Sequence, residues 1–458
     1  MLNTRIARCP VRLERGDLAA VLARLGEAGD WTPAILSSQK TFLQLAGVEG
    51  KLAPAASPTS PLSGPQAAVG DVFFDGDDMY YLISSSSEPE VRFTERGMYG
   101  SVEEPFLGLE IGVMSPAVQG TAEKLNRLAG AIEDAIRGSL DGRKTRHMTF
   151  AWESVQTEAV KLKRVLERAD ENGSLKLTPA ALDDGEVMSS EVLTQPDARR
   201  LLITLAQSGF GRERDIVSGS RREGIADALS ELTKAGLVDQ SFLLECKRGG
   251  APLTRIVDKA ALENPAVAGL ICGVCGSAYK DEILVPGYAV SDLGRTLIRK
   301  SHWMNIWLTK VLVSLGVPVE SIVWNLAEEG EEVDLIMDFR GQLWIFEMKD
   351  REFGAGDAYP FNYRMARYGA FRGVIVTADK VSKDAKRVFE DLSKEAGRTR
   401  RPGPLPIFVE GLASARPVLG KELALASLTY ARRRLGGLGQ FSGHDFGQVL
   451  HARYGQDG

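Results

Sequence analysis

Alternation of apolar and polar positions is clearest between residues 300 and 412. The run HWMNIWLTKVLVSLG repeats apolar residues every three or four positions, which predicts an amphipathic helix ending at Gly316. Three strands follow in ESIVWN, EEVDLIMDF and LWIFEMK, and the turn RGQ joins the last two as a hairpin. A helix that Pro360 breaks or begins, the strand RGVIVTA, a helix ending at Gly397 and the strand LPIFVEG complete the run. The predicted order is αβββαβαβ, an α/β domain.

The pattern upstream predicts an α+β N-terminal domain over residues 1–185. LAAVLARLGEAG predicts a short helix, DVFFDGDDMYYLIS a hairpin turning at Asp-Gly-Asp-Asp, and residues 117–140 and 150–170 two long helices. The first long helix repeats its apolar residues at Leu125, Leu128, Ile132 and Ile136. Residues 51–70, rich in Pro, Ala, Ser and Gly, predict a linker or long loop. No residue in 1–185 points to chemistry, so we expect an interaction, sensor or oligomerisation module.

Residues 190–262 predict a winged-helix-like α+β domain. PDARRLLITLAQSG predicts a helix closing at Gly209, REGIADALSELTKAGLV another, and QSFLLECKRGGAPLTRIV two strands around a Gly-Gly turn. This order of helices and hairpin resembles a winged helix. Six arginines of the segment can face nucleic-acid phosphates: Arg199, Arg200, Arg212, Arg214, Arg221 and Arg222. Acidic residues interleave with them, so a salt-bridged surface and a purely protein-binding role both stay open.

The cysteines suggest a metal site within residues 263–298. Four cysteines in a 458-residue chain do not make a disulfide framework in a reducing compartment. LICGVCGSAY places Cys272 and Cys275 in a Cys-x-x-Cys knuckle, one half of a tetrahedral thiolate site. Cys246 stands where a second pair would begin, but Gly249 occupies its partner's place. The segment resembles a degenerate zinc ribbon, and both a Zn site of Cys246, Cys272 and Cys275 and a metal-free remnant stay open.

Composition and charge limit the class of protein. With 44% hydrophobic and 26% charged residues the chain is expected to be globular, and its length predicts two to four domains. A net charge of −5 excludes an evenly basic surface but permits a local basic groove. The N-terminal residues lack a secretory apolar run, and no segment approaches the roughly 20 apolar residues of a membrane span. We therefore expect a cytoplasmic protein with no membrane partner, ending in a helical extension over residues 413–458.

Candidate chemistry lies in the apolar run WIFEMKD, where an acid and a base stand two residues apart. In the strand 343–349, Glu347 and Lys349 project from one face, about 7 Å apart. Hairpin pairing can bring Asp334 of the preceding strand beside Glu347. Two carboxylates about 4 Å apart repel by about 4 kcal/mol at an effective dielectric near 20, so they need a cation or a shared proton. Lys349 offsets one charge, and a hard ion such as Mg²⁺ would take the rest.

The run EVDLIMDFRGQLWIFEMKD, set in this order of elements, resembles the PD-(D/E)xK nuclease superfamily across residues 300–412. The resemblance implies an αβββαβ restriction-endonuclease-like core with Asp334, Glu347 and Lys349 as catalytic residues. It also implies a Mg²⁺ or Mn²⁺ site formed by Asp334, Glu347 and the backbone carbonyl of Met348. Val333 replaces the proline of the motif.

A second departure concerns the helix before the first strand. Asn305 stands where many members carry a metal-binding Glu. The alternative acids are Glu328, Glu331 and Glu332. The resemblance further implies substrate contacts at Asn305, Tyr363 and Arg364.

The function that the resemblance implies is a Mg²⁺-dependent endonuclease that hydrolyses phosphodiester bonds of nucleic acid, DNA before RNA. It suggests a prokaryotic anti-phage or restriction-type effector in which the N-terminal region binds a second copy of the chain or a partner protein. The alternative is a catalytically inactive nuclease fold that binds DNA or serves as a scaffold.

Overall fold

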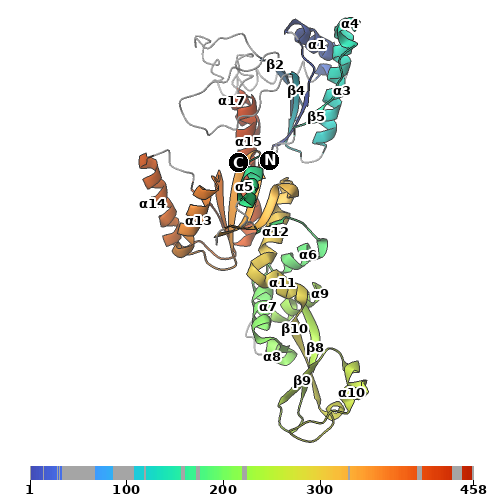
Figure 1. The fold of residues 1–458 in the computed structure, drawn as a ribbon, viewed down its shortest axis with the longest axis vertical. Helices are drawn as coiled ribbons and strands as arrows, with labels where there is room; N and C mark the ends of the chain where they lie inside the picture. Colours follow the sequence, from blue (N-terminus) through green and yellow to red (C-terminus); the bar gives the residue numbers. More distant parts are fainter. Residues whose placement is uncertain are drawn as a thin grey trace. The chain divides into compact units, whose positions relative to one another are not determined.

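The structure is a computed structural model. It describes residues 2–13, 15–27, 29, 31–33, 68–85, 108–117, 120–155, 160–171, 176–218, 224–328, 331–399, 405–435 and 446–455. The chain forms two compact units, Met1–Val160 with Pro417–Gly458, and Lys161–Arg416 (Figure 1). Both units mix helices with sheets, so the chain is of mixed α/β class. In the parts of the chain described, no helix is both long and apolar enough to cross a membrane.

The first unit is built on an antiparallel sheet. Its strands are β1 (Asn3–Cys9), β2 (Ala68–Asp75), β3 (Asp78–Ser85), β4 (Gly108–Ser115) and β5 (Glu153–Ser154). Their order across the sheet is β2-β3-β4-β1-β5. The predicted hairpin is confirmed: β2 and β3 pair along their whole length, and Gly76 turns between them with φ 58°. The helices of this unit are α1 (Arg15–Glu27), α3 (Thr121–Ser139), α4 (Gly142–Thr145), α15 (Ala415–Leu435) and α17 (Phe446–Tyr454).

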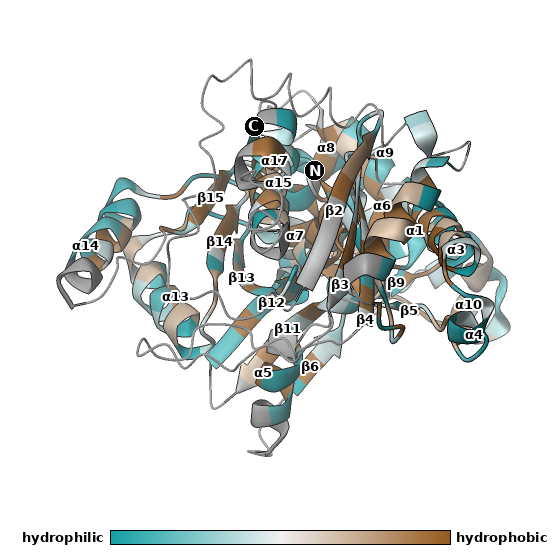
Figure 2. Cartoon of the chain, turned by 90° about the horizontal axis from the view of Figure 1, so that it is seen from above, coloured by the Kyte–Doolittle hydropathy of each residue, from teal (hydrophilic) through white to brown (hydrophobic). Residues whose placement is uncertain are grey.

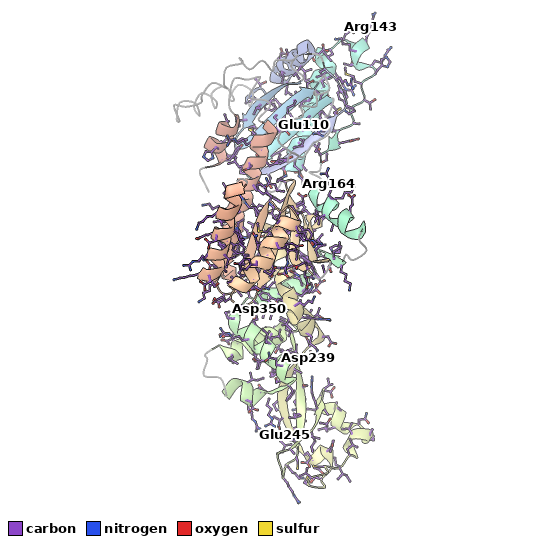
Figure 3. All side chains as sticks on the ribbon, turned by 60° about the vertical axis from the view of Figure 1, so that its left-hand side comes forward. Glu110, Arg143, Arg164, Asp239, Glu245 and Asp350 are labelled. Carbon is purple, nitrogen blue, oxygen red and sulfur yellow. The ribbon has the colours of Figure 1, made fainter. Side chains whose placement is uncertain are left out.

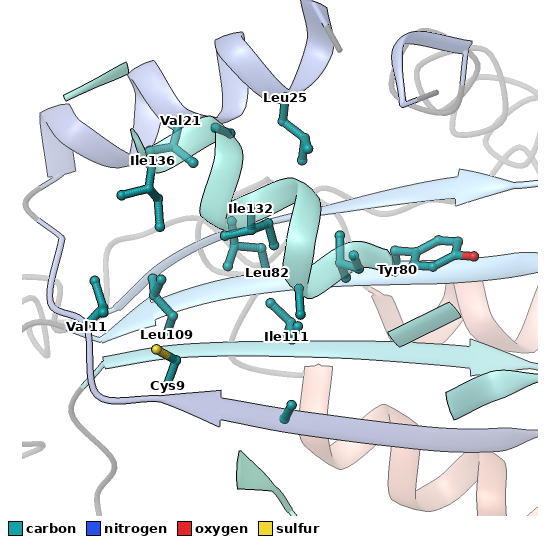
Figure 4. Close-up of a cluster of buried hydrophobic side chains, with 14 of the residues drawn as sticks. Cys9, Val11, Val21, Leu25, Tyr80, Leu82, Leu109, Ile111, Ile132 and Ile136 are labelled. Carbon is teal, nitrogen blue, oxygen red and sulfur yellow. The ribbon is translucent and has the colours of Figure 1, made fainter. Parts of the chain in front are cut away.

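Helices cover both faces of this sheet. Figure 4 shows Ile132 and Ile136 of α3 pointing toward Leu82, Leu109 and Ile111 of the strands. The apolar spacing predicted for this helix is confirmed, because all four of its marker residues are buried. Alternation along β1 sends Ile6 to the opposite face. There it packs in a second cluster with residues of α15 and α17, namely Ala431, Val449 and Leu450.

Two predictions for the first 185 residues need correction. The helix expected at 150–170 is wrong in its first part, since Glu153–Ser154 is a strand paired with Arg8 and Ala7 of β1. The edge of β1 accepts backbone hydrogen bonds there, and this tertiary pairing outweighs local propensity. The linker expected at 51–70 lies outside the described residues up to 67, and residues 68–70 already belong to β2.

The second unit contains a small sheet next to several helices. The helices are α6 (Asp184–Val192), α7 (Pro196–Ser208), α8 (Glu213–Ser218), α9 (Ile225–Lys234) and α10 (Pro265–Ala268). The strands are β7 (Gly211–Arg212), β8 (Val238–Glu245), β9 (Pro252–Ile256) and β10 (Ile283–Val290), in the order β7-β10-β8-β9. The predicted hairpin is confirmed as β8 and β9, and α7 ends at Gly209, whose φ is 75°. The strand β10, which pairs with the full length of β8, comes later in the chain.

The larger sheet of this unit has six strands. They are β6 (Lys176–Pro179), β11 (Ile322–Glu328), β12 (Glu331–Phe339), β13 (Gln342–Lys349), β14 (Arg372–Thr377) and β15 (Ile407–Glu410). Figure 2 shows them side by side in the order β15-β14-β13-β12-β11-β6. The accompanying helices are α5 (Val160–Glu171), α11 (Asp292–Ile298), α12 (His302–Ser314), α13 (Ala355–Arg367) and α14 (Lys383–Thr399).

The predicted order αβββαβαβ is confirmed from α12 to β15. β11, β12 and β13 are antiparallel, whereas β13, β14 and β15 are parallel. The strand β6 falls within the N-terminal segment 1–185 of the prediction, yet it pairs with β11, and the compact unit begins at Lys161. A short polar stretch such as 176–179 carries no apolar pattern that would assign it to a distant sheet edge.

The helix after β13 starts earlier than its sequence suggests. We expected Pro360 to break or begin it, but α13 runs from Ala355 through Pro360 to Arg367. The Gly354 N–H donates to the Oδ2 of Asp357 at 3.0 Å, which caps the first turn, and Ala358 and Phe361 are buried. Capping and burial therefore offset the one helix hydrogen bond that proline removes. The early start places Asp357 next to the end of β13.

Candidate active site

Two paired strands carry the predicted acidic residues. The register of β12 with β13 joins Ile336 to Ile345 and Leu335 to Phe346. One step further along this register, Asp334 lies opposite Glu347, so their side chains project from the same face. The Met348 N–H donates to the Oδ2 of Asp334 at 2.7 Å and holds that carboxyl at the strand pair.

Glu347 is buried between two cations. Its side chain is 7% exposed, with Oε1 at 3.0 Å from the Lys349 Nζ and Oε2 at 2.7 Å from the Arg364 Nη1. The Arg364 Nε also donates to the Oε2 of Glu331 at 2.8 Å. Charge-assisted contacts of this kind are stronger than neutral hydrogen bonds, and they engage both carboxyl oxygens of Glu347 in a site with little water.

Asp334 differs from Glu347 because neither Lys349 nor Arg364 forms an ion pair with it. Burial and, after it, the negative charge of Glu347 raise the pKa of Asp334 to about 7. The Met348 N–H and the Lys349 charge act in the opposite direction without overcoming this. A further cation beside Asp334 and Glu347 would stabilise the charged form of Asp334.

Lys349 stays an ammonium in this environment. Burial by itself lowers its pKa, but the attraction of Glu347 and the weaker attraction of Asp357 and Asp334 outweigh burial, so the pKa is raised. Its Nζ lies 3.7 Å from the Oδ1 of Asp357 as well. These contacts favour Lys349 as a stabiliser of negative charge over Lys349 as a general base.

A row of amides continues the acidic pair across the sheet. The β11–β12 register joins Trp324 to Leu335 and Leu326 to Val333, which puts Asn325 opposite Asp334. Asn325 accepts a hydrogen bond at 3.1 Å from the Nδ2 of Asn305, a buried residue of α12. The Oδ1 of Asn305 is buried and has no hydrogen-bond partner among the described residues. Such an unpaired buried oxygen costs free energy unless an ion, a water or a ligand reaches it.

The predicted substrate contacts divide into two groups. Arg364 reaches Glu347 from α13, and Asn305 reaches the amide row from α12. Tyr363 does not join them: it is 52% exposed, and its hydroxyl accepts a hydrogen bond from Arg367. Met348 contributes its N–H to Asp334, while its carbonyl stays a predicted metal ligand.

The alternative acids to Asn305 have other contacts. Glu331 is bound by Arg364, and Glu332 lies 3.1 Å from the Lys300 Nζ. The side chain of Glu328 lies outside the described residues. The two described acids thus act as ion-pair partners in this structure.

Sequence patterns missed two polar residues of the site. Asn325 interrupts the β-branched strand ESIVWN and adopts φ 50°, a left-handed conformation that Asn tolerates better than most residues. Asp357 was missed because the helix was expected to be broken at Pro360 or to begin there, three residues after Asp357. An Asn inside an apolar strand and an Asp three residues after a Gly were the available signals.

The arginines of the segment that was predicted to form a winged helix are mostly engaged within the chain. Arg199 is buried and donates to the Leu193 carbonyl at 2.7 Å, so it does not face a phosphate. Arg212 lies 2.7 Å from the Oε1 of Glu245, and Arg200 3.9 Å from Asp197. Figure 3 labels Glu245 and Asp239 at the two ends of β8. Arg221 and Arg222 lie outside the described residues.

The three predicted zinc ligands come together at a second location. Cys246, Cys272 and Cys275 meet Glu282, and the four ligand atoms all lie within 4.8 Å of one another. This cluster can hold a metal ion. Glu282 was not among the sequence candidates.

Comparisons with known proteins do not assign a family. No family model matches the sequence, and no curated protein matches it. Among solved structures, the chain is similar to the crystal structure of protein VC1899 from Vibrio cholerae, with a TM-score of 0.35 and 12% identity. That alignment covers 68% of this chain and 83% of the other. A likeness at this level carries no argument about function.

Proposed function

We propose that the protein is a metal-dependent nuclease that hydrolyses phosphodiester bonds of nucleic acid. The observation that carries this proposal is the convergence of Asp334, Glu347 and Lys349 on two paired strands of the larger sheet. Their order in the chain and the αβββαβαβ succession of elements support a restriction-endonuclease-like core. The alternative is that the three charged residues only form ion pairs across the sheet. Such pairs contribute only about 0–1 kcal/mol when they lie at the surface, which does not explain charged residues on strands this buried.

In this proposal Asp334 and Glu347 hold Mg²⁺ or Mn²⁺, together with the Met348 carbonyl. Carboxylate oxygens suit these hard ions. Burial and the charge of Glu347 raise the pKa of Asp334 to about 7, and a bound cation would favour its charged form. The bound ion would supply Lewis acidity and neutralise charge on the phosphate. Lys349 stabilises the negative charge that develops on the phosphate oxygens, and Arg364 orients the phosphate through its planar guanidinium.

The segment from α6 to β10 has a separate proposed role. The succession α7, β7, α8, α9, β8 and β10 supports a winged-helix-like module interrupted by the insert between β8 and β10. Because Arg199, Arg200, Arg212 and Arg214 are engaged by acids and carbonyls, a role in binding protein is favoured over reading DNA. The same proposal includes nucleic acid as the partner of the larger sheet and a cytoplasmic location. It also includes a second copy bound through the N-terminal region and a part in anti-phage defence.

Two specific observations favour a second candidate function. Both oxygens of Glu347 are already engaged by cations, and Asn305 stands where an acid would complete a metal site. An inactive nuclease fold that binds DNA or acts as a scaffold fits these two facts.

Metal binding and cleavage together separate the two functions. Full-length protein would be titrated with Mn²⁺ by electron paramagnetic resonance and incubated with plasmid, single-stranded DNA and RNA in Mg²⁺ or Mn²⁺. We expect Mn²⁺ binding and cleavage that stops on chelation. Asp334→Asn should weaken Mn²⁺ binding, and Lys349→Ala should keep binding but reduce cleavage on the order of 100-fold or more.

Glu352→Gln provides the matched control, since Glu352 follows the same strand but is 44% exposed and pairs with Lys380. This variant should bind and cut like the wild type. If wild type, Asp334→Asn and Lys349→Ala bind Mn²⁺ alike and none of them cuts any substrate, the inactive scaffold becomes the preferred function.

A further inference from the structure

The insert between β8 and β10 has almost no apolar core. From Lys247 to Glu282 only Ile256, Cys272 and Glu282 are buried. Large apolar side chains are instead exposed in this insert, and these are Val257, Leu270, Ile271 and Val274. Segments that bury this little apolar surface usually need a disulfide or a metal to stay folded, and the cysteines here are free thiols.

Two turns of the insert share one shape. In the first, the Gly250 N–H donates to the Cys246 carbonyl at 2.7 Å; in the second, the Gly276 N–H donates to the Cys272 carbonyl at 2.8 Å. Both glycines have positive φ, 64° and 73°. The Gly249 N–H additionally points at the Cys246 Sγ, 3.4 Å away. Each turn is thus closed by a backbone hydrogen bond to the carbonyl of its first cysteine, as in the knuckles that hold a metal.

The turns differ at one position. The second turn has Cys275 three residues after its first cysteine, whereas the first turn has Gly249 at that place. Glu282, next to β10 in the chain, supplies the fourth ligand atom that the first turn lacks. It is buried, its Oε2 accepts from the Lys247 N–H at 2.6 Å, and its Oε1 lies 2.7 Å from the Cys275 Sγ. A backbone N–H of the first turn therefore aims this carboxylate at the thiols.

The position of Glu282 also leaves room for a metal cation as its charge partner. Among the described residues no Lys, Arg or His side chain forms an ion pair with it, although it is 8% exposed. Three cysteine sulfurs and one carboxylate oxygen form a donor set that a metal ion can bind and neutralise. In tetrahedral Zn²⁺ sites, ligand atoms lie roughly 3.6–3.8 Å apart, given the usual bond lengths. The four atoms here, all within 4.8 Å of one another, need only small movements to reach that geometry.

We infer that Cys246, Cys272, Cys275 and Glu282 bind one Zn²⁺ in a closed tetrahedral site that holds the insert together. Thiolates favour zinc over Mg²⁺ or Ca²⁺, and four protein ligands leave no open position for a substrate, as in structural zinc sites. The ion would tie the end of β8 to the residues that lead into β10. This site is independent of the nuclease proposal.

Metal content tests the inference directly. Full-length protein, purified without added metal, would be analysed by inductively coupled plasma mass spectrometry, with zinc release followed colorimetrically as thiols are modified. We expect one zinc per chain for the wild type and for Asp334→Asn, and a large loss of zinc for Cys272→Ser. A wild-type chain that stays metal-free even after incubation with Zn²⁺, or that carries an iron–sulfur cluster, overturns the inference.

The role of Glu282 needs a rescue, because a variant that loses zinc can simply misfold. Glu282→Ala should bind zinc more weakly, and adding Gly249→Cys should restore binding through a fourth thiolate. The space allows this: a Cβ on Gly249 would lie 3.9 Å from the Cys246 Sγ and 3.3 Å from the nearest atom of Val274.

Cobalt gives the spectroscopic signature. With Co²⁺ in place of zinc, the wild type should show tetrahedral d–d bands, and the double variant should show stronger thiolate-to-cobalt charge transfer than the wild type. If Glu282→Ala binds Co²⁺ with unchanged affinity and an unchanged spectrum, Glu282 is not a ligand.

Discussion

At the scale of single residues, the candidate site is defined by an imbalance between two carboxyls that share one face of the sheet. Glu347 has two cationic partners, and its neighbour Asp334 has a backbone N–H. Burial and the negative charge of Glu347 together make ionised Asp334 unfavourable in the metal-free protein. Residues that serve a function often lower stability in this way.

The pH dependence of stability should reveal this cost. The pKa of Asp334 is about 7 in the folded chain against 3.8 for an ordinary Asp. Below pH 3.8 the carboxyl is protonated in both folded and unfolded chains and costs nothing. As pH rises toward 7 the folded chain keeps a proton that the unfolded chain loses, so stability falls and then levels off.

Asp334→Asn removes the titration and should therefore stabilise the metal-free protein at pH 8, on the order of 1–3 kcal/mol. The gain should shrink steadily as pH is lowered toward 4. Thermal unfolding of wild type and variant in chelator across this pH range measures it, with Glu352→Gln, a substitution outside the acidic pair, as the control. A variant that is less stable than wild type at pH 8 would contradict a raised pKa.

At the scale of elements, the position of α13 decides whether Arg364 and Asp357 reach the strands. Gly373 of β14 allows the close approach of this helix, because a Cβ there would overlap Met365 and lie 2.9 Å from the Phe361 ring. Phe361 in turn packs edge-on against Phe389 of α14, at 6.3 Å between ring centroids. A small residue on a buried strand thus sets the geometry of a charged site.

Gly373→Ala should push α13 outward and destabilise the second unit by about 1–3 kcal/mol. The shift would also loosen the contacts of Arg364 and Asp357, so Mn²⁺ affinity should change with it. Gly356→Ala on the same helix is the matched control, because its added Cβ meets nothing within 4 Å, and it should stabilise by about 0.5–1 kcal/mol. Chemical denaturation and Mn²⁺ titration check both, and equal stabilities for the two variants would count against this packing.

At the scale of the whole molecule, residues from the two ends of the chain complete one unit. The sheet formed by residues 3–154 buries its second face under Ala431, Val449 and Leu450, close to the C-terminus. The 413–458 segment, expected as a helical extension, therefore supplies part of a core. Since α17 packs in the core of the first unit, we expect the stability of that unit to depend on this helix.

Leu450→Ala should accordingly weaken the first unit, since Leu450 is fully buried and such truncations cost about 2–5 kcal/mol. Hydrogen–deuterium exchange should quicken in β2 and β3 and stay unchanged in β12 and β13. His451→Ala, at the exposed neighbouring position, should leave both regions unchanged. If exchange in β2 and β3 is as slow in the Leu450→Ala variant as in the wild type, α17 does not stabilise this sheet.

The sequence by itself determined the elements whose apolar periodicity is strong. The order from α12 to β15, the helix α3 and the β2–β3 hairpin follow from local patterns, because side-chain periods of 3.6 and 2 depend on neighbouring residues alone. The same periodicity selected Asp334, Glu347 and Lys349, since charges stand out on an apolar strand.

Only the tertiary structure decided which distant segments meet. β5 pairs with β1, β6 with β11, and Glu282 reaches cysteines that lie up to 36 positions earlier in the chain. These segments are short and polar, so their placement depends on unpaired strand edges and buried thiols elsewhere in the fold. Asn325 was hidden for the same reason, since its role arises from its register with β12. The role of Asp357 arises from its contact with Lys349 at the end of β13, although the cap that starts its helix is local.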